Sequence, residues 1–349
     1  MPDTPYSDLP PSAYWKTAMG DNFADLTGLY QPKWRIGPEH AVATYGSCFA
    51  QHFGRSLRAR KFTWVDGEPA PAGLEKEAAE RFGYGVFSAR TANIYTPTLL
   101  AQWGRWAFAG EEVPQEAWAQ DGRVYDPFRP RIEPEGFASE EEMRRLQGVA
   151  IRAFRRSIEE ADVLVFTLGL TERWLNAAGF EYPMCPGTAA GTFDESAHRF
   201  DNLGFLEAKA GMEEAMSLFK AANPGLRFLL TVSPVPLVAS ASGRHVLAAT
   251  MQSKAILRAV AGDLAASRED TDYFPSFEII FNPIYGRRFF QDNLRGIAPG
   301  GVNRVMGHFF DTQAAIFGAP EAAGSDAEDE ARADVICEEE LLGSFGGRS

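Results

Sequence analysis

The chain has 349 residues, of which 45% are hydrophobic and 23% are charged, as in an ordinary soluble globular protein. Its formal net charge is −13 and no basic block interrupts the acidic balance, which argues against a nucleic-acid-binding surface. The richest basic stretch, residues 55–61, has its charges at helical spacing beside Phe53 and Leu57. This spacing indicates the solvated face of a helix, and a site for an anionic substrate is the alternative.

The cysteines Cys48, Cys185 and Cys337 are odd in number and lack paired spacing, so they predict neither a disulfide framework nor a zinc site. We expect no metal and no organic cofactor. The first five residues lack the basic and apolar regions of a secretory signal, and no apolar run approaches the roughly 18–20 residues of a membrane span. A reducing cytoplasm is the expected compartment.

The first elements that the sequence predicts are an arm and a strand–turn–helix unit. Residues 1–38 are rich in Pro, Tyr and Trp without a clear period, and we expect them to wrap the surface. Residues 41–45 form a short apolar run that predicts a buried strand, which Gly46 breaks. Apolar residues then recur at helical spacing over 49–57, which places Ser47 in the turn between strand and helix.

Predicted helices and strands alternate along the rest of the chain. The predicted helices cover residues 96–109, 139–160, 204–221, 245–266 and 301–317. The predicted strands cover residues 163–167, 227–232 and 277–280. Ser139 and Glu142 form a capping box at the start of one helix. This alternation predicts an α/β fold, a three-layer α/β/α sandwich with a mostly parallel sheet.

Three regions follow from these patterns. Residues 1–38 are the arm and residues 39–317 are the α/β domain. Residues 318–349 are an acidic tail in which Ala, Glu, Asp and Gly dominate, so we expect disorder over 320–333. Residues 335–345 fit a short docking helix.

Ligands of open parallel sheets bind beyond the carboxyl ends of the strands. The segments that follow the predicted strands begin with Gly46 and Ser47, with Gly169 and Thr171, and with Ser233. The fourth follows residue 280 and is also polar. Each predicted strand end therefore carries a small or polar group, as a site at a sheet edge requires.

The run from Tyr45 to Ala50, Tyr-Gly-Ser-Cys-Phe-Ala, resembles the signature of the GSCFA family, a branch of SGNH/GDSL-type esterases. Further similar motifs lie in the same order at residues 93–96, 167–172, 198–202, 231–236, 253–254 and 273–278. The resemblance covers roughly residues 14–312. It implies an SGNH-hydrolase-like, flavodoxin-like fold with Ser47 as nucleophile and the backbone N–H of Ser47 as an oxyanion donor.

Position alone leaves two other interpretations of this turn open. A serine is a poor nucleophile unless a base removes its proton and fixed donors stabilise the oxyanion. Ser47 would otherwise be a helix N-cap, a role that serine fills commonly. Cys48 is the rival nucleophile, although the following residue is expected to turn toward the core, where a thiol behaves as a small hydrophobe.

The resemblance also implies further donors for the oxyanion, a Gly backbone and an Asn side chain. Asn93 takes that place in the sequence, with a turn residue as the alternative, and Ala92 stands where many relatives have Gly. Thr171 offers a hydroxyl where relatives typically have an amide. We therefore expect substrate or oxyanion contacts from a set of residues near the strand ends. The set is Gly46, Asn93, Gly169, Thr171, Ser233 and Arg199.

The catalytic base is missing from its expected place. Related enzymes take it from an Asp-x-x-His pair ahead of the last helix, but Asn293 and Gly296 occupy the corresponding positions. The remaining candidates are His245, at a helix start where the dipole favours a neutral imidazole, and His198. His52 is one turn into the helix after Ser47 and is a further option.

The remaining candidate site residues are the last two histidines and several charged residues. His40 precedes the first strand, and His308 fits a packed or surface helix position. Glu172 or Glu278 would orient a histidine as the acid of a triad, while Glu172 beside Arg173 is equally a structural ion pair. Arg199 and Arg295 match a substrate carboxylate or phosphate.

The expected function is that of a serine-dependent esterase or O-acyltransferase that acts on an acylated carbohydrate or a similar small ester. Loss of the Asp-x-x-His pair favours an alternative, a non-catalytic binding protein that keeps the pocket. A scaffold in envelope-polysaccharide biosynthesis, with the acidic tail as a partner-binding segment, is a third reading. The carbohydrate link is an inference from fold-level resemblance. The oligomeric state stays open.

Overall fold

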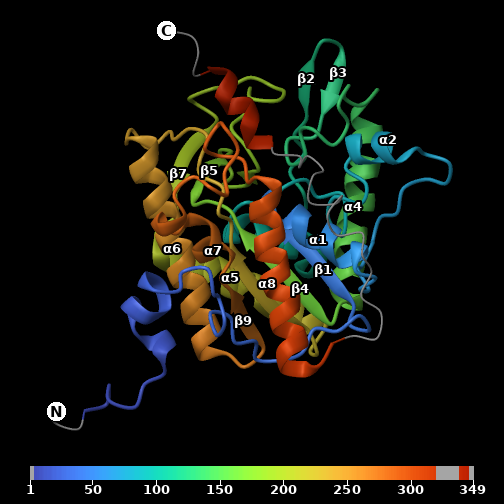
Figure 1. Cartoon of the computed structure of the whole chain (residues 1–349). Coiled ribbons are helices and arrows are strands. Elements are labelled where there is room, and N and C mark those ends of the chain that lie inside the picture. Colours follow the sequence, from blue (N-terminus) through green and yellow to red (C-terminus); the bar gives the residue numbers. More distant parts are fainter. Residues whose placement is uncertain (1–3, 320–337, 346–349) are drawn as a thin grey trace.

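A four-stranded parallel sheet forms the centre of the molecule (Figure 1). The computed structural model describes residues 4–319 and 338–345. The strands lie in the order β1 (Val42–Gly46), β4 (Val163–Leu168), β8 (Arg227–Val232) and β9 (Thr271–Phe274). A parallel bridge from Trp64 to Val42 extends the sheet beyond β1. With this bridge, the chain order across the sheet is second, first, third, fourth and fifth, as in flavodoxin-like doubly wound folds.

Alternate residues of each strand enter different hydrophobic cores. In β4, Leu164 and Phe166 belong to one core, while Val163 and Val165 belong to the other. All six residues of β4 are buried. A continuous apolar run is typical of a parallel strand that helices cover on both faces.

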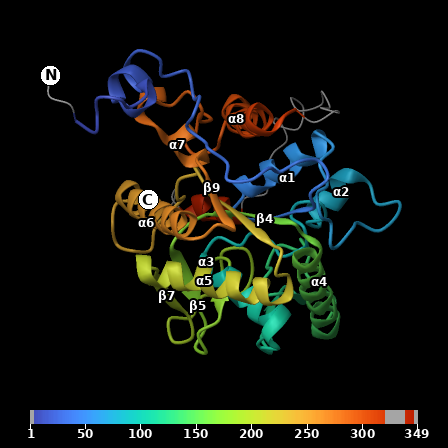
Figure 2. The same cartoon turned by 90° about the horizontal axis from the view of Figure 1, so that it is seen from below.

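Two helical layers cover the sheet, as Figure 2 shows in a view that separates α7 and α8 from α4 and α5. On one face lie α1 (Phe49–Ala59), α7 (Ser276–Phe281) and α8 (Pro299–Phe317). On the other lie α3 (Pro97–Gly104), α4 (Glu140–Glu160), α5 (Phe205–Ala222) and α6 (Val246–Ser267). The expected three-layer α/β/α sandwich is confirmed.

Several short elements lie outside the sandwich and were not predicted. β5 (Glu172–Leu175) pairs antiparallel with β6 (Glu181–Tyr182) and β7 (Arg199–Asn202) directly after β4. β2 (Trp118–Gln120) and β3 (Arg123–Tyr125) form a hairpin between the predicted helices at 96–109 and 139–160. The remaining helical pieces are α2 (Lys76–Arg81) and the short turns Pro11–Ala13, Lys16–Gly20 and Pro283–Tyr285.

The predicted strand at residues 277–280 is wrong, because these residues lie in α7 and the last strand is β9. Ile279 and Ile280 pack into the core on the α8 side. Glu278 is therefore a helix residue, and its carboxylate accepts a hydrogen bond from Tyr273 Oη at 2.7 Å. A short apolar run fits a buried strand and a buried helical turn equally well, which explains the error.

Capping residues set the start of two predicted helices. The Ser139 hydroxyl accepts a hydrogen bond from the backbone N–H of Glu142 at 3.1 Å, as the capping box predicts. Thr96 caps α3 in the same way through Leu99 N–H at 3.0 Å. The helix predicted to end at residue 109 continues from α3 as one π-helical turn, Arg105–Ala109.

Both ends of the described chain pack against the domain. Tyr30 and Ile36 of the arm are buried in the core beside α8. The predicted disorder at residues 320–333 lies outside the described residues. Of the helix predicted at 335–345, the described part is a 3₁₀ helix, Glu338–Phe345, which we call the C-terminal segment.

Candidate active site

Gly46 ends β1 in a conformation that brings two strands into direct contact. Its φ is +134°, and a Cβ at this position would lie 2.4 Å from the carbonyl oxygen of Thr167 in β4. A side chain is therefore excluded by both backbone conformation and space. The next residue, Ser47, is placed at the carboxyl ends of β1 and β4, where the strand order reverses and ligands of such sheets bind.

Ser47 is buried, with 2% of its surface exposed, and its hydroxyl has no hydrogen-bond partner among the described residues. The N-cap of α1 is Cys48, which makes no side-chain capping bond, so Ser47 does not act as the cap. The backbone N–H of Ser47 donates to Thr167 O at 3.0 Å. The N–H that the resemblance assigned to the oxyanion is thus committed to the sheet.

Gly169, after β4, lies against the nucleophile turn. A Cβ on Gly169 would lie 3.0 Å from both the Ser47 Cβ and a ring carbon of Tyr95. The Gly169 N–H donates to Tyr95 O at 2.9 Å. This close approach explains why a glycine stands here and fixes the segment of residues 93–96 beside Ser47.

Asn93 reaches the same edge from the loop before α3. Ile94 N–H donates to the carbonyl of Gly46 at 3.0 Å, which holds the loop along the end of β1. Ala92 has φ +61°, a left-handed conformation, so the loop keeps the backbone shape that a glycine would adopt. Asn93 is buried and lines a cavity of about 520 Å³ together with Ala92 and Leu341 of the C-terminal segment.

The other two predicted polar contacts are engaged in local structure. The Thr171 hydroxyl donates to Asn202 Oδ1 at 2.7 Å, which ties β5 to β7. Ser233 closes the turn after β8, where its hydroxyl accepts from Val235 N–H at 3.3 Å. Both lie at the carboxyl edge, but neither hydroxyl forms a hydrogen bond with Ser47 Oγ.

The histidines expected to act as base cap turns elsewhere. His245 is the N-cap of α6, and its Nδ1 accepts from Leu247 N–H at 3.2 Å. His198 Nδ1 accepts from Asp194 N–H at 3.0 Å in the loop before β7. Neither forms a hydrogen bond with Ser47, so the predicted triad is not assembled in this structure.

Two of the charged residues predicted at the site, Glu172 and Arg199, make their contacts away from Ser47. Glu172 accepts hydrogen bonds from the Ser240 hydroxyl and from Ala241 N–H, and thereby fixes the loop after β8 rather than a histidine. Arg199 is two-thirds exposed, with a guanidinium nitrogen 4.0 Å from Asp201. The second sheet that follows β4 accounts for both placements, because it carries these residues away from the β1–β4 junction.

His52 is a histidine that the structure places at this edge. Its side chain is buried on α1, and its Nδ1 has no partner among the described residues. Burial, reinforced by nearby Arg55, lowers the pKa of His52 to about 3, so its imidazole is neutral at pH 7. It lines a cavity of about 340 Å³ with Cys48, which therefore faces this cavity, and with Arg295.

Lys254 is a site residue for which sequence reasoning assigned no role. It lies on α6 with 2% of its surface exposed, and its ammonium group donates to the carbonyl of Gly169. The neighbouring Ser253 hydroxyl accepts from Thr171 N–H at 3.0 Å. A lysine among the buried positions of a helix is the signal that could have indicated it, because a buried ammonium needs partners.

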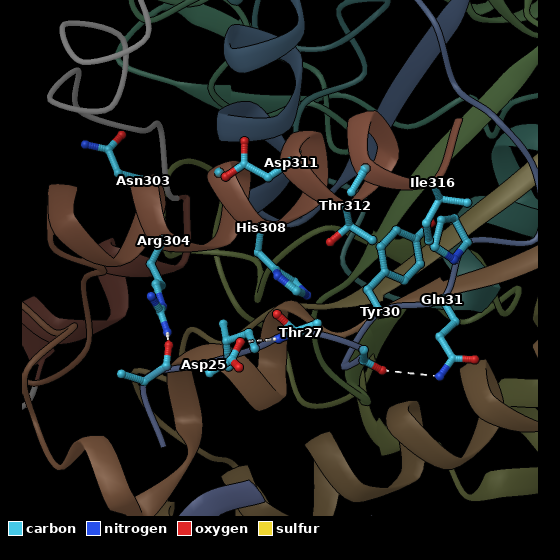
Figure 3. A pocket seen from close by; sticks show the side chains of 16 residues that line it. Asp25, Thr27, Tyr30, Gln31, Asn303, Arg304, His308, Asp311, Thr312 and Ile316 are labelled. Carbon is cyan, nitrogen blue, oxygen red and sulfur yellow. Dashed lines mark hydrogen bonds between the residues drawn. The ribbon is translucent and has the colours of Figure 1, made fainter. Parts of the chain in front are cut away.

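A larger hollow of about 900 Å³ lies between the arm and the outer face of α8 (Figure 3). Figure 3 shows Arg304 and His308 pointing from α8 toward the arm residues Asp25 and Thr27. Burial, and secondarily Arg304, lowers the pKa of His308. Ser47 is not among the residues that line this hollow, so the two sites are separate.

In the part of the chain that the structure describes, no helix combines the length and the apolar character needed to cross a bilayer. No group of three or more His, Cys, Asp or Glu residues within the described ranges is arranged to hold a metal ion.

Comparison with known proteins identifies one family. The model of the GSCFA family matches residues 41–309, most of the chain, which confirms the resemblance inferred from the motifs. No curated protein and no solved structure matches. The matched range includes Ser47, Asn93, Gly169, Lys254 and Arg295.

Proposed function

The chain belongs to the GSCFA family, and on that premise we propose that it is a serine-dependent esterase or O-acyltransferase with Ser47 as nucleophile. The substrate is an acylated carbohydrate or a similar small ester, as the resemblance to SGNH enzymes implies. One observation supports this proposal above the others. Three buried side-chain atoms without hydrogen-bond partners among the described residues gather at the β1–β4 edge: Ser47 Oγ, Thr167 Oγ1 and His52 Nδ1.

An unpaired buried polar group costs about 1–3 kcal/mol of stability, so native proteins keep few of them. Gly46 faces Thr167 in the strand register, and Ser47 and His52 flank the first turn of α1. Several unpaired buried polar groups at one place are typical of a binding site, where a bound ligand supplies the missing hydrogen-bond partners. The carboxyl edge of the sheet is also where the doubly wound topology positions ligands.

The reaction follows from a serine hydroxyl at this edge. Ser47 Oγ attacks the carbonyl carbon of the ester and passes its proton to a base, and the bond from that carbon to the alcohol oxygen then breaks. The base returns the proton to the departing alcohol. Water in a hydrolase, or a sugar hydroxyl in a transferase, then takes the acyl group from Ser47. We assign the side-chain donation to the oxyanion to Asn93.

His52 is the base that we assign to this mechanism. Its imidazole is neutral at pH 7, and it lies on the helix that Ser47 precedes. A pKa of about 3 makes this imidazole a weak base in the free protein, so the proposed role requires that substrate binding raise that pKa. The two side chains form no hydrogen bond in this structure. Proton transfer therefore requires a bridging water or a shift of the first turn of α1, and catalytic hydrogen bonds often tighten only when substrate binds.

A second candidate is a non-catalytic binding or scaffold protein that keeps the same pocket and serves polysaccharide biosynthesis. The engaged N–H of Ser47 and the absence of an assembled base among the described residues favour it. The compartment stays a prediction from composition, a reducing cytoplasm.

Labelling with a fluorophosphonate probe separates the two candidates. An enzyme incorporates the probe at Ser47, which intact-mass and peptide mass spectrometry locate, and Ser47→Ala abolishes the label. Cys48→Ser is the matched control in the same turn and should keep it. His52→Gln should slow labelling by roughly 100-fold or more, the usual contribution of a general base.

Absence of label from the wild-type chain would contradict the enzymatic proposal. Labelling of the Ser47→Ala variant at an unchanged rate would do the same, because the nucleophile would then be another residue.

A further inference from the structure

The C-terminal segment lies over the carboxyl edge of the sheet. Figure 1 shows it in red near the end of α8 at which that helix begins. Its Glu339 N–H donates to the Tyr95 hydroxyl at 3.3 Å, and the backbone N–H of Val238, after β8, donates to the Glu339 carboxylate at 3.4 Å. Leu341 lines the cavity that contains Asn93. The segment thus contacts loops from both sides of the nucleophile turn.

The Glu339 carboxylate is held in a cationic recess. Arg295 Nη2 lies 3.1 Å from Glu339 Oε2, and both side chains are only 12% exposed. Burial raises the pKa of Glu339, whereas the charges of Arg295 and Lys254 each lower it. A buried carboxylate is costly unless cations and donors compensate it, and here two cations from different elements do so.

Arg295 is held in place independently of the segment. Its Nε donates to the carbonyl of Pro236 at 3.1 Å. Asn293 Oδ1 accepts from the backbone N–H groups of Arg295 at 3.0 Å and Gly296 at 2.9 Å, which fixes the turn that carries the arginine. A guanidinium oriented in this way matches a carboxylate with little loss of side-chain freedom.

The recess adjoins the nucleophile. Lys254 donates to the carbonyl of Gly169, and Gly169 packs directly against Ser47. Glu340, the next residue of the segment, lines the cavity that contains Cys48, His52 and Arg295. Lys254 and Gly169 therefore connect the recess that holds the Glu339 carboxylate with the turn that carries Ser47.

We propose that Arg295 and Lys254 form a subsite for a carboxylate group of the substrate, and that Glu339 occupies this subsite until the substrate displaces the C-terminal segment. The inference rests on the proposed acyl-transfer function and narrows it: the ester carries a free carboxylate in its acyl or its alcohol part. The segment then covers Ser47 in the absence of substrate and exposes it when substrate binds.

The first test does not depend on catalysis. Hydrogen–deuterium exchange of amides in residues 338–345 is measured in the full chain with added glutarate, with its neutral analogue glutaramide and with inorganic phosphate. Glutarate should raise exchange of the segment at concentrations on the order of 10 mM, because it competes with an intramolecular carboxylate. Glutaramide should have no effect, and phosphate a weaker one.

Substitutions of Glu339 and Arg295 test whether these two side chains hold the C-terminal segment in place. Glu339→Gln should raise exchange of the segment roughly tenfold without any ligand, since it removes the charge-assisted bond to Arg295. Glu135→Gln is the matched control, because Glu135 forms an exposed ion pair with Arg81 elsewhere on the surface. Arg295→Gln should mimic Glu339→Gln and abolish the response to glutarate. Arg295→Lys, which keeps the charge, should restore part of the response and shows that the loop still folds.

The second test measures whether displacement of the C-terminal segment from the subsite changes the reactivity of Ser47. Fluorophosphonate labelling of Ser47 should be roughly tenfold faster in Glu339→Gln than in the wild type, because the segment no longer covers the site. If Ser47 is never labelled but glutarate displaces the segment, the proposed function fails and the subsite stands. If Ser47 is labelled at the same rate in all variants and glutarate changes nothing, the subsite is wrong and Glu339 only anchors the tail. Equal displacement by phosphate would overturn the assignment to a carboxylate.

Discussion

The charge state of His52 governs the chemistry available beside Ser47. A histidine in water titrates near 6.5, whereas burial and the neighbouring Arg55 lower the pKa of His52 to about 3. The imidazole therefore stays neutral in the folded chain throughout the physiological range. A pKa of about 3 also makes the imidazole a weak proton acceptor, because a general base works best with a pKa near the operating pH, so a role as base for Ser47 requires this pKa to rise when substrate binds.

The same shift predicts how stability depends on pH. Below about pH 6.5 the unfolded chain protonates this histidine while the folded chain does not, so the free energy of unfolding falls as the pH falls toward about 3. The slope from this group is at most about 1.4 kcal/mol per pH unit. Urea unfolding at several pH values should show a shallower dependence in His52→Gln. His198→Gln, in an external loop, should keep the wild-type slope, and an equal slope for all three proteins would contradict the burial of His52.

At this scale the sequence located some site residues and not others. Ser47 and Gly169 could be predicted because a small or polar residue directly follows an apolar strand in each case. His198 and His245 could not be placed, because each lies at the far end of a long segment after its strand. Lys254 lies in one of the motifs shared with the family, but the sequence did not indicate its role, because its burial depends on how α6 packs against the loop of Gly169.

Among the elements, the junction of β1 and β4 has the tightest fit. A Cβ at Gly46 would meet the oxygen, nitrogen and carbonyl carbon of Thr167, all within 3 Å and all backbone atoms. The backbone atoms of a strand cannot move aside as the end of a flexible side chain can. The two strands must therefore separate to admit any other residue, and the nucleophile turn would move with them.

Gly46→Ala should destabilise the chain by about 3 kcal/mol or more, through an unfavourable φ and a clash. Gly73→Ala is the matched control, because Gly73 also has a positive φ, of +86°, but nothing lies within 4 Å of the added Cβ. It should cost about 1 kcal/mol. Urea unfolding measures both, and equal losses would show that space at the junction does not matter.

The boundary between β9 and α7 shows that a short apolar pattern is not enough to predict whether a segment forms a strand or a helix. Residues 277–280 are apolar apart from Glu278, and over four residues a strand and a helical turn bury the same side chains. Tertiary packing decides between them, because Ile279 and Ile280 enter the core that also contains residues of α8. Within the helix, Phe277 and Phe281 stack one turn apart, with ring centroids 5.1 Å from each other. The 21 residues of α4 have a clear helical period, which left no such choice, and this helix was predicted correctly.

At the scale of the whole molecule, the arm is fastened to the last strand. The Tyr30 hydroxyl donates to the Asp272 carboxylate at 3.0 Å, and Lys33 N–H donates to the same oxygen at 3.1 Å. Tyr30 is buried against Phe274 and Phe309. The arm thus contributes to the core on the α8 side and is not a loose extension.

Tyr30→Phe should lower the free energy of unfolding by about 1.5–3 kcal/mol, because it leaves a buried carboxylate with one donor fewer. Tyr6→Phe, at a position that is 69% exposed, should change it by less than about 0.5 kcal/mol. Thermal and urea unfolding provide the comparison. An unchanged stability of Tyr30→Phe would mean that the arm does not depend on this contact.

The sandwich could be predicted because β4 is a continuous apolar run and because α4, α5 and α6 are long. The second sheet could not, since its strands have four, two and four residues and show no alternation. That sheet is what separates Glu172 and Arg199 from the nucleophile. The incomplete prediction of the site therefore follows from the incomplete prediction of the fold.

The two borders of the central sheet are both occupied by the chain itself. At β1, Val42 exchanges backbone hydrogen bonds with Thr63 and Val65. At β9, the Lys33 ammonium donates to Thr271 O at 2.8 Å. Exposed strand borders recruit other chains and start aggregation, and a lysine is a common obstacle to such recruitment. Removing the arm should therefore do more than destabilise the fold: it would open β9 to pairing between molecules, so the arm also protects solubility.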